Sequence, residues 1–261
     1  MKFKKLTFKY FLFLLSFFPL QSVFAADSMG KVCVVFIENS SYVSFSSING
    51  PGKDIALMKS ALSSYKIDKI VHKKNMTKKQ MQSFFATELK KIVVDNNIQS
   101  ILIWYAGHGK YLNNHSYWIP VDAKRDLETS YYSTNSLKAD LKAYSKSIKH
   151  TLMVTDACES GPSFYQSMRA SSTIKDCSSN AAELKSSQVF SSSGYELAVE
   201  NSEFTKTFAN TLKSSNTTCI PIDKIVTEVT KNVIIKNKQR PKFGAIKDFD
   251  HQDGTFFFVK K

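Results

Sequence analysis

The sequence has few acidic side chains for its number of basic ones, with 22 Asp and Glu against 36 Lys and Arg in 261 residues. A net charge of +14 would suit nucleic acid or an anionic envelope as a partner. The chain lacks, however, the aromatic and basic motifs of known nucleic-acid modules, and lysine pairs such as Lys78 and Lys79 fall on expected helix faces. We therefore expect no nucleic-acid partner, while attraction to an anionic membrane or envelope stays open.

Closely spaced pairs of metal ligands are also missing. His108, His115 and Cys158 are the candidate ligands, but their separation in the sequence is not typical of a zinc site. No internal repeat occurs either. We expect a protein that requires no metal and no other cofactor.

No apolar run is long enough to span a membrane. Four lysines in the first nine residues precede the run 10–18, which stops at Pro19 after about ten residues, whereas a span needs about twenty. Small residues around Ala25 complete the pattern of a secretory signal peptide over residues 1–25. No cysteine follows to carry a lipid, so we expect residues 26–261 to be periplasmic or secreted, without a transmembrane segment. The sequence does not predict an oligomeric state.

Only four cysteines occur in the chain. Cys33 lies in an apolar run and Cys158 in a turn-like motif, whereas Cys177 and Cys219 lie in polar stretches. Export to an oxidising compartment favours a disulfide between these last two, although their spacing does not show that they meet in space. The Cys177–Cys219 pair is therefore a candidate disulfide.

Short apolar runs alternate with helical patterns along most of the chain, which is typical of an α/β fold. Thr77 and Gln80 predict a capping box at the start of one of these helices. A serine-rich stretch without periodicity, 162–187, predicts a long mobile loop. The pattern favours one domain in which helices flank a mostly parallel sheet. We expect strands at 32–37, 67–71, 101–105, 151–154, 189–190 and 255–259, and helices at 54–65, 78–95, 137–148, 204–212 and 221–235.

Two chemically active residues follow buried-type strands. His108 comes directly after the strand 101–105, and Cys158 directly after the strand 151–154. Because the carboxyl ends of parallel strands meet at one edge of a sheet, and fifty residues suffice for a helix and a return to the neighbouring strand, the two side chains are expected to face each other.

A histidine beside a cysteine is the minimal machinery of a cysteine peptidase. The imidazole takes the thiol proton, the thiolate attacks a carbonyl carbon, and the imidazolium protonates the leaving amine. The backbone N–H groups of Gly109 and Cys158 are the expected oxyanion donors. Alone, Cys158 could be a small buried residue and His108 a turn residue, but their joint placement favours catalysis.

Three motifs carry a family resemblance: YAGHG at 105–109, WIPVDA at 118–123 and DACESG at 156–161. Weaker matches follow at 38–42, 52–56 and 254–258. Together they resemble peptidase family C14, the caspases and metacaspases, and in particular bacterial metacaspase-like proteins. The resemblance implies a caspase-like three-layer sandwich with a mainly parallel six-stranded sheet, and a cysteine-type endopeptidase that acts on peptides or proteins.

The same resemblance implies a specificity. Metacaspases have acids at the positions of Asp54 and Asp156, which favour Arg or Lys before the cleaved bond because carboxylates make charge-assisted hydrogen bonds to cations. Structural alternatives are a helix cap for Asp54 and a turn hydrogen bond for Asp156. Calcium, which activates some metacaspases, has no acidic cluster to bind here.

The sequence also departs from the family. Glu159 stands where metacaspases often have His, and Glu38 where relatives commonly have Gly. A carboxylate near the thiol would raise its pKa and weaken the nucleophile, so the alternative function is a catalytically weak homologue that serves as a binding or signalling module. Arg169, Lys175 and Lys185 in the predicted loop are candidate sites of autocleavage.

Overall fold

The computed structural model describes residues 29–157, 165–167, 175, 177, 180–192, 202–237 and 240–261. The predicted signal peptide, much of the predicted loop 162–187, and both Cys158 and Glu159 lie outside these residues. None of the helices within them is long and apolar enough to cross a membrane.

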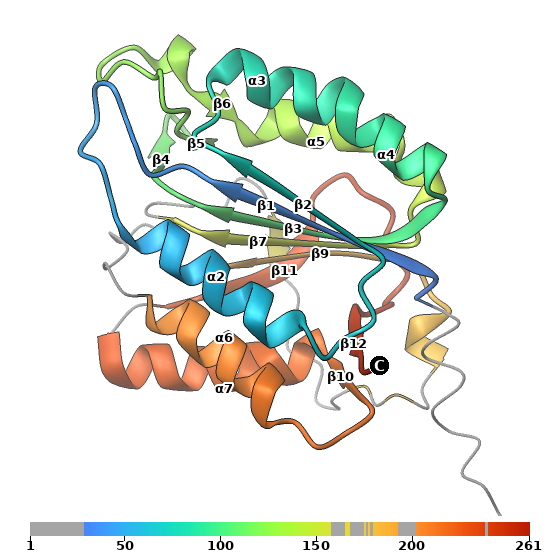
Figure 1. Ribbon diagram of the computed structural model, residues 1–261. Helices are drawn as coiled ribbons and strands as arrows, with labels where there is room; N and C mark the ends of the chain where they lie inside the picture. Colours follow the sequence, from blue (N-terminus) through green and yellow to red (C-terminus); the bar gives the residue numbers. More distant parts are fainter. Residues whose placement is uncertain are drawn as a thin grey trace, which may run out of the picture.

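A seven-stranded sheet forms the centre of the molecule, in the order β2-β1-β3-β7-β9-β11-β8 (Figure 1). The first five strands in this order are parallel, β11 is antiparallel to β9, and β8 is antiparallel to β11. The predicted α/β fold with a mainly parallel six-stranded sheet is confirmed, with β8 as an additional three-residue edge strand. The strands are β1 (Lys31–Glu38), β2 (Lys69–Lys74), β3 (Ile98–Ala106), β7 (His150–Asp156), β8 (Tyr165–Ser167), β9 (Ser186–Ser191) and β11 (Lys242–Ile246).

Helices cover both faces of this sheet (Figure 1). On one face lie α2 (Gly50–Leu62), α6 (Glu203–Ser214) and α7 (Ile222–Asn237), and on the other lie α3 (Lys78–Ser83), α4 (Leu89–Asp95) and α5 (Thr134–Lys142). Alternate residues of each strand enter the two cores, as the two-residue period of a strand requires. In β1, for example, Val34 and Phe36 pack toward α2 and α6, while Val35 and Ile37 pack toward α3 and α4.

The helix expected at 78–95 begins where its capping box predicted. The Thr77 side chain accepts from the Gln80 N–H, and the Gln80 side chain accepts from the Thr77 N–H. A π-helical turn, Phe84–Glu88, separates α3 from α4. This wider turn lets two consecutive side chains, Phe84 and Phe85, both be buried. The helical spacing of apolar residues in the sequence did not predict this π-helical turn.

Two small sheets and several boundaries differ from the sequence predictions. Pro221 ends a strand and does not open a helix, and β9 begins at Ser186, inside the predicted loop. Ser186 and Ser187 looked like loop residues, but both are buried, and the Ser186 hydroxyl bonds His150 Nδ1 at 3.0 Å. The small sheets are β4-β5-β6 (Gly109–Leu112, His115–Trp118, Tyr132–Ser133) and β10-β12 (Cys219–Pro221, Phe257–Val259), and the 3-10 turns are Glu128–Ser130, Ser145–Ser147 and Asn180–Ala182.

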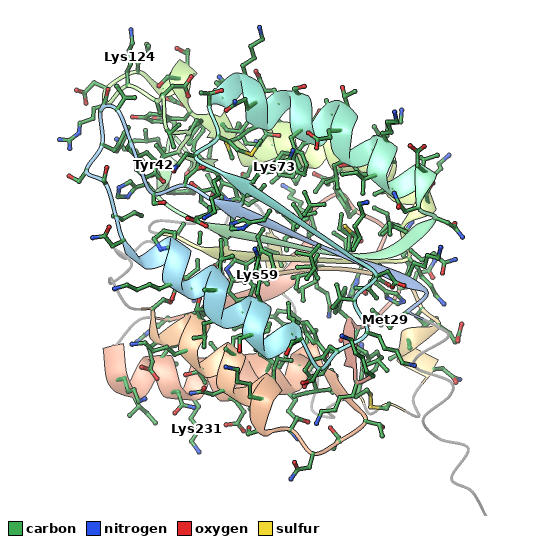
Figure 2. The ribbon with its side chains drawn as sticks, in the orientation of Figure 1. Met29, Tyr42, Lys59, Lys73, Lys124 and Lys231 are labelled. Atoms are coloured by element: carbon green, nitrogen blue, oxygen red, sulfur yellow. A yellow bond between two sulfur atoms is a disulfide. The ribbon has the colours of Figure 1, made fainter. Side chains whose placement is uncertain are left out.

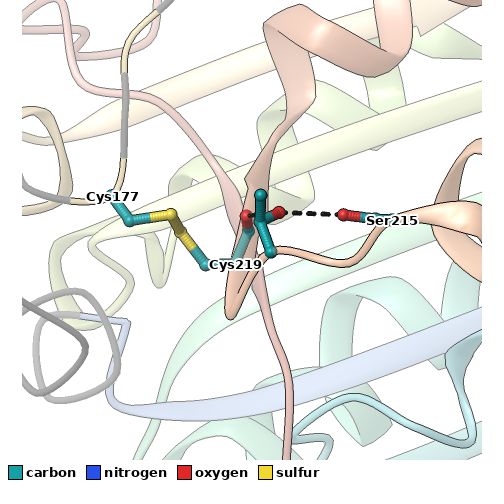
Figure 3. Close-up of a disulfide and its surroundings, with 4 residues drawn as sticks. Cys177, Ser215 and Cys219 are labelled. Atoms are coloured by element: carbon teal, nitrogen blue, oxygen red, sulfur yellow. Dashed lines mark hydrogen bonds between the residues drawn. A yellow bond between two sulfur atoms is a disulfide. The ribbon is translucent and has the colours of Figure 1, made fainter.

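Cys177 and Cys219 are joined by a disulfide, with their Cα atoms 6.1 Å apart (Figure 3). The bond ties the segment before β9 to β10, which pairs with the C-terminal strand β12. Cys33 is a free, buried thiol, and burial raises its pKa to about 11. It is therefore not a candidate nucleophile.

Candidate active site

The carboxyl ends of β1, β3 and β7 meet at one edge of the main sheet. Glu38 pairs with Ala106, and Ala106 pairs with Asp156, so the three strands end side by side. His108 follows β3 by two residues, and Cys158 follows β7 by two. Tyr42 lies at this end of the molecule and Met29 at the other (Figure 2). Cys158 itself lies outside the described residues, but Ala157 directly before it is buried at this edge.

His108 is oriented by three residues of the segment between β1 and α2. Its backbone N–H donates to the Tyr42 hydroxyl at 2.8 Å, and its ring lies 4.6 Å from the Tyr42 ring and 5.9 Å from the Phe45 ring. Its Nε2 is 2.8 Å from the carbonyl oxygen of Ser46. Because a carbonyl oxygen can only accept, Nε2 carries the hydrogen, and the lone pair of a neutral imidazole is on Nδ1. His108 is thus prepared to act as a base through Nδ1.

The segment that holds His108 is itself anchored in the fold. Asn39 is buried, its amide donates to the Ile119 carbonyl at 3.1 Å, and its side-chain oxygen accepts from the Met76 N–H at 2.9 Å. The Tyr42 hydroxyl donates to the Asn39 carbonyl at 3.0 Å. At Gly107 a Cβ would lie 2.7 Å from that hydroxyl oxygen, so only glycine allows this approach.

Asp54 and Asp156, the two acids that the resemblance singled out, lie close enough for the charge of one to act on the other. Both are nearly buried, with 9% and 8% of their surfaces exposed. Burial and the neighbouring charge of Asp156 raise the pKa of Asp54 to about 7, against weaker opposing effects of Lys206 and Lys53. Asp54 is not a helix cap, because α2 begins at Gly50 and its N-cap is Asn49.

Asp156 differs from Asp54 in its hydrogen bonds. Burial raises the pKa of Asp156 above its ordinary value, and the hydroxyls of Ser202, Thr205 and Ser192 oppose this rise. One of these is Thr205, whose Oγ1 donates to Oδ2 of Asp156 at 2.6 Å. The Asp156 carboxyl therefore accepts a hydrogen bond from a side chain of α6. The alternative role, a hydrogen bond to the backbone of its own turn, is not what the structure shows.

The remaining candidate residues from the sequence are Gly109, His115 and Cys158. Gly109 opens β4 next to His108, opposite Trp118, while the second predicted oxyanion donor, the Cys158 N–H, lies outside the described residues. His115 is exposed at the far end of the same hairpin, with its Nδ1 3.2 Å from the Asn135 amide. Over the parts of the chain that the structure describes, no group of three or more His, Cys, Asp or Glu side chains could hold a metal ion.

Glu38 is buried in a cluster with His72 and Lys74. Its Oε2 lies 2.8 Å from His72 Nε2 and 3.5 Å from Lys74 Nζ, and His72 Nδ1 lies 2.7 Å from Lys59 Nζ. Since an ammonium only donates, Nδ1 accepts from Lys59 and Nε2 donates to Glu38. The unusual acid at position 38 is therefore held by the neutral His72 and by the cation of Lys74.

Sequence reasoning missed the residues that orient the predicted ones. Tyr42, Phe45 and the Ser46 carbonyl position His108, and Thr205 positions Asp156. A backbone carbonyl has no residue signature, and no sequence signal placed Thr205 beside β7, 49 residues away.

Comparisons with known proteins agree with this geometry. The chain matches the peptidase family C14 caspase domain over residues 31–249. Its fold is similar to that of the crystal structure of caspase-1 from Spodoptera frugiperda, with a TM-score of 0.58 and 14% sequence identity over 84% of this chain and 87% of that one. No curated protein sequence matches. The family match covers most of the chain, and the protein therefore belongs to the caspase-domain family of peptidases.

Proposed function

We propose that the protein is an exported cysteine endopeptidase that cleaves after Arg or Lys with a His108–Cys158 dyad. The observation that carries the proposal is the presence, at one edge of the sheet, of an oriented imidazole and a buried acid pair. A caspase-domain fold alone would fit either an enzyme or a binding module. The two features together fit a peptidase with a cation-binding pocket.

The reaction follows from the tautomer of His108. Nδ1 takes the thiol proton of Cys158, and the thiolate attacks the substrate carbonyl carbon. The N–H groups of Gly109 and Cys158 stabilise the resulting oxyanion. His108 then protonates the leaving amine, which leaves a thioester on Cys158, and water hydrolyses that thioester with His108 again as base. The Ser46 carbonyl stabilises the imidazolium at the two stages where it forms.

The acid pair supports a basic residue before the cleaved bond. Asp156 is two residues before Cys158 in the sequence, so a substrate bound at Cys158 would have this acid within reach. A guanidinium or ammonium group would relieve the repulsion between Asp54 and Asp156 and form charge-assisted hydrogen bonds, whereas a substrate aspartate would add a third negative charge. Cleavage after Asp, as in caspases, is therefore disfavoured.

The direct test is cleavage of fluorogenic peptides that end in Arg, Lys or Asp by residues 26–261, with and without calcium. We expect release after Arg and Lys that is lost in both Cys158→Ala and His108→Ala. Release after Asp would contradict the pocket assignment. If no peptide is cleaved and Cys158 is inert to a thiol-reactive probe, the protein is the non-catalytic binding module.

Autocleavage after Arg169 or Lys175 is part of the proposal, whereas Lys185 is excluded by its surroundings. The Lys185 carbonyl accepts from Gln252 N–H at 2.9 Å, and the Ser186 N–H donates to Lys149 O at 3.0 Å, so the bond between them is held in the fold. We expect two fragments from the wild type and none from Cys158→Ala. Equal fragmentation of both would indicate a contaminating protease.

Location is proposed from the leader alone. The signal-peptide pattern favours export to the periplasm or beyond, and the Cys177–Cys219 disulfide is compatible with an oxidising compartment. Fractionation of cells that express the full chain, with mass analysis of the N-terminus, tests both the location and the cut after Ala25. A chain that keeps its leader in the cytoplasm would contradict this proposal.

A further inference from the structure

The two acids of the pocket have unequal partners. Thr205, the third residue of α6, is fully buried, and its Oγ1 donates to Asp156 Oδ2 at 2.6 Å. Ser202, the N-cap residue of α6, accepts the Thr205 N–H at 3.3 Å, and its hydroxyl is among the groups that lower the pKa of Asp156. Because that hydroxyl oxygen accepts from the helix, its hydrogen is free to donate to the carboxyl. Asp156 thus receives the Thr205 hydroxyl at the positive end of a helix, and the hydroxyls of Ser202 and of Ser192, which follows β9, also lower its pKa.

Asp54 has no such support. In the part of the chain that the structure describes, no hydrogen bond or ion pair reaches its carboxyl. The charged groups around it are Asp156 from β7, Lys206 from α6 and Lys53 on its own helix. Its burial is close to that of Asp156, so the hydroxyl donors are the main difference between the two acids.

We propose that Thr205 is a positioning residue for cation recognition, which with Ser202 holds Asp156 ionised and fixed, so that the pocket's exchangeable proton resides on Asp54. This inference rests on the proposed function. Hydrogen bonds to a carboxylate favour its charged form, and two adjacent carboxyls do not ionise together. When a guanidinium or ammonium group enters, Asp54 loses its proton to solvent and both carboxylates face the cation.

The arrangement makes recognition depend on pH. The pKa of Asp54 is raised to about 7, so the empty pocket carries one negative charge in mild acid and two in mild base. The KM for an Arg peptide should therefore fall as pH rises through about 7. Removal of the Thr205 hydroxyl should move the proton toward Asp156 and weaken this dependence.

The kinetic test compares two nearly isosteric variants, Thr205→Val and Thr205→Ser. Loss of a hydrogen bond to a charged group predicts that Thr205→Val raises KM for an Arg peptide roughly tenfold to hundredfold, while kcat changes little and Thr205→Ser stays close to the wild type. A merely structural role would instead lower the folded fraction and the apparent kcat. Equal KM and equal pH profiles in both variants would overturn the proposal.

A second measurement does not depend on activity. Carboxyl carbons of ¹³C-labelled aspartate are followed by NMR against pH in the Cys158→Ala protein, with and without Nα-acetylarginine amide. We expect a carboxyl that titrates near pH 7, is absent in Asp54→Asn, and ionises when the amide is added. If that signal persists in Asp54→Asn, or does not respond to the amide, the inference is wrong. If it behaves as expected but no Arg or Lys peptide is cleaved, only the proposed peptidase function fails.

Discussion

Two buried acidic regions lie near the same edge of the sheet, and they are built in opposite ways. Glu38 is surrounded by His72 and Lys74, with Lys59 behind the histidine. Asp54 is placed against another acid and has no ion pair among the described residues. A buried charge that serves only structure is normally neutralised, so the pair left short of a cation is the one that our proposal assigns to recognition of a substrate cation.

The largest expected effect is on activity. Asp156→Asn removes the fixed carboxylate and leaves a buried substrate cation without its partner, so kcat/KM for an Arg peptide should fall roughly 10²–10³-fold. Glu38→Gln, the matched control in the neutralised region, should change it less than about fivefold. Steady-state kinetics on both variants test this contrast, and a similar loss in both would erase the distinction between the two regions.

A second prediction is that loss of the Asp54 carboxylate stabilises the fold at neutral and higher pH. The pKa of Asp54 is about 7 in the folded protein and 3.8 in its ordinary state, so the folded state retains a proton that the unfolded state loses. Wild-type stability therefore declines as pH rises from about 4 to 7. Asp54→Asn removes this cost, which is at most about 4 kcal/mol at 1.36 kcal/mol per pKa unit, while it impairs cleavage.

Thermal unfolding at two pH values measures this effect. Asp54→Asn should unfold several degrees above the wild type at pH 8 and close to it at pH 4. The control Glu38→Gln should be less stable than the wild type at pH 8, because it breaks the buried contacts of Glu38 with His72 and Lys74. A destabilised Asp54→Asn protein at pH 8 would mean that Asp54 supports the fold.

The smallest effect is expected at His72. Burial and the neighbouring Lys59 lower the pKa of His72 below 6.5, although the Glu38 contact opposes this. A histidine with a lowered pKa contributes stability that is lost as pH falls below 6.5 toward its folded value. His72→Gln should remove this loss, so that the rise of the unfolding temperature from pH 7 to pH 5 that Asp54 produces is about 1–2 °C larger in the variant than in the wild type. An unchanged slope would show that His72 titrates as it does in solution.

Some features of the fold were predictable because the signal was local. Thr77 and Gln80 marked a helix start through their own hydrogen bonds, and buried strand patterns placed His108 at a strand end. Other features depend on distant partners. Ser186 looks like a loop residue in the sequence, but in the fold it is buried and its hydroxyl bonds His150 Nδ1. The π-helical turn at Phe84 lies where two consecutive aromatic side chains enter one core, which the sequence period did not predict.

The same distinction applies to the candidate site. Sequence motifs resembling those of a known family pointed to His108, Asp54 and Asp156, and the chemistry of these residue types is known. The groups that orient them, Thr205 and the Ser46 carbonyl, are ordinary in type and reach the site only through tertiary structure. The sequence supplied the residues that we propose to react, and the structure was needed for the tautomer of His108 and for the difference between Asp54 and Asp156.

The most direct test of the central claim is a comparison of two fluorogenic peptides that differ only in Arg or citrulline before the cleaved bond. Citrulline keeps the shape of arginine and lacks its charge. The account predicts that the wild type cleaves the Arg peptide with a kcat/KM at least about 10²-fold higher, as expected when charge-assisted hydrogen bonds are lost in a buried site. Equal cleavage of the two peptides would contradict a pocket built on Asp54 and Asp156.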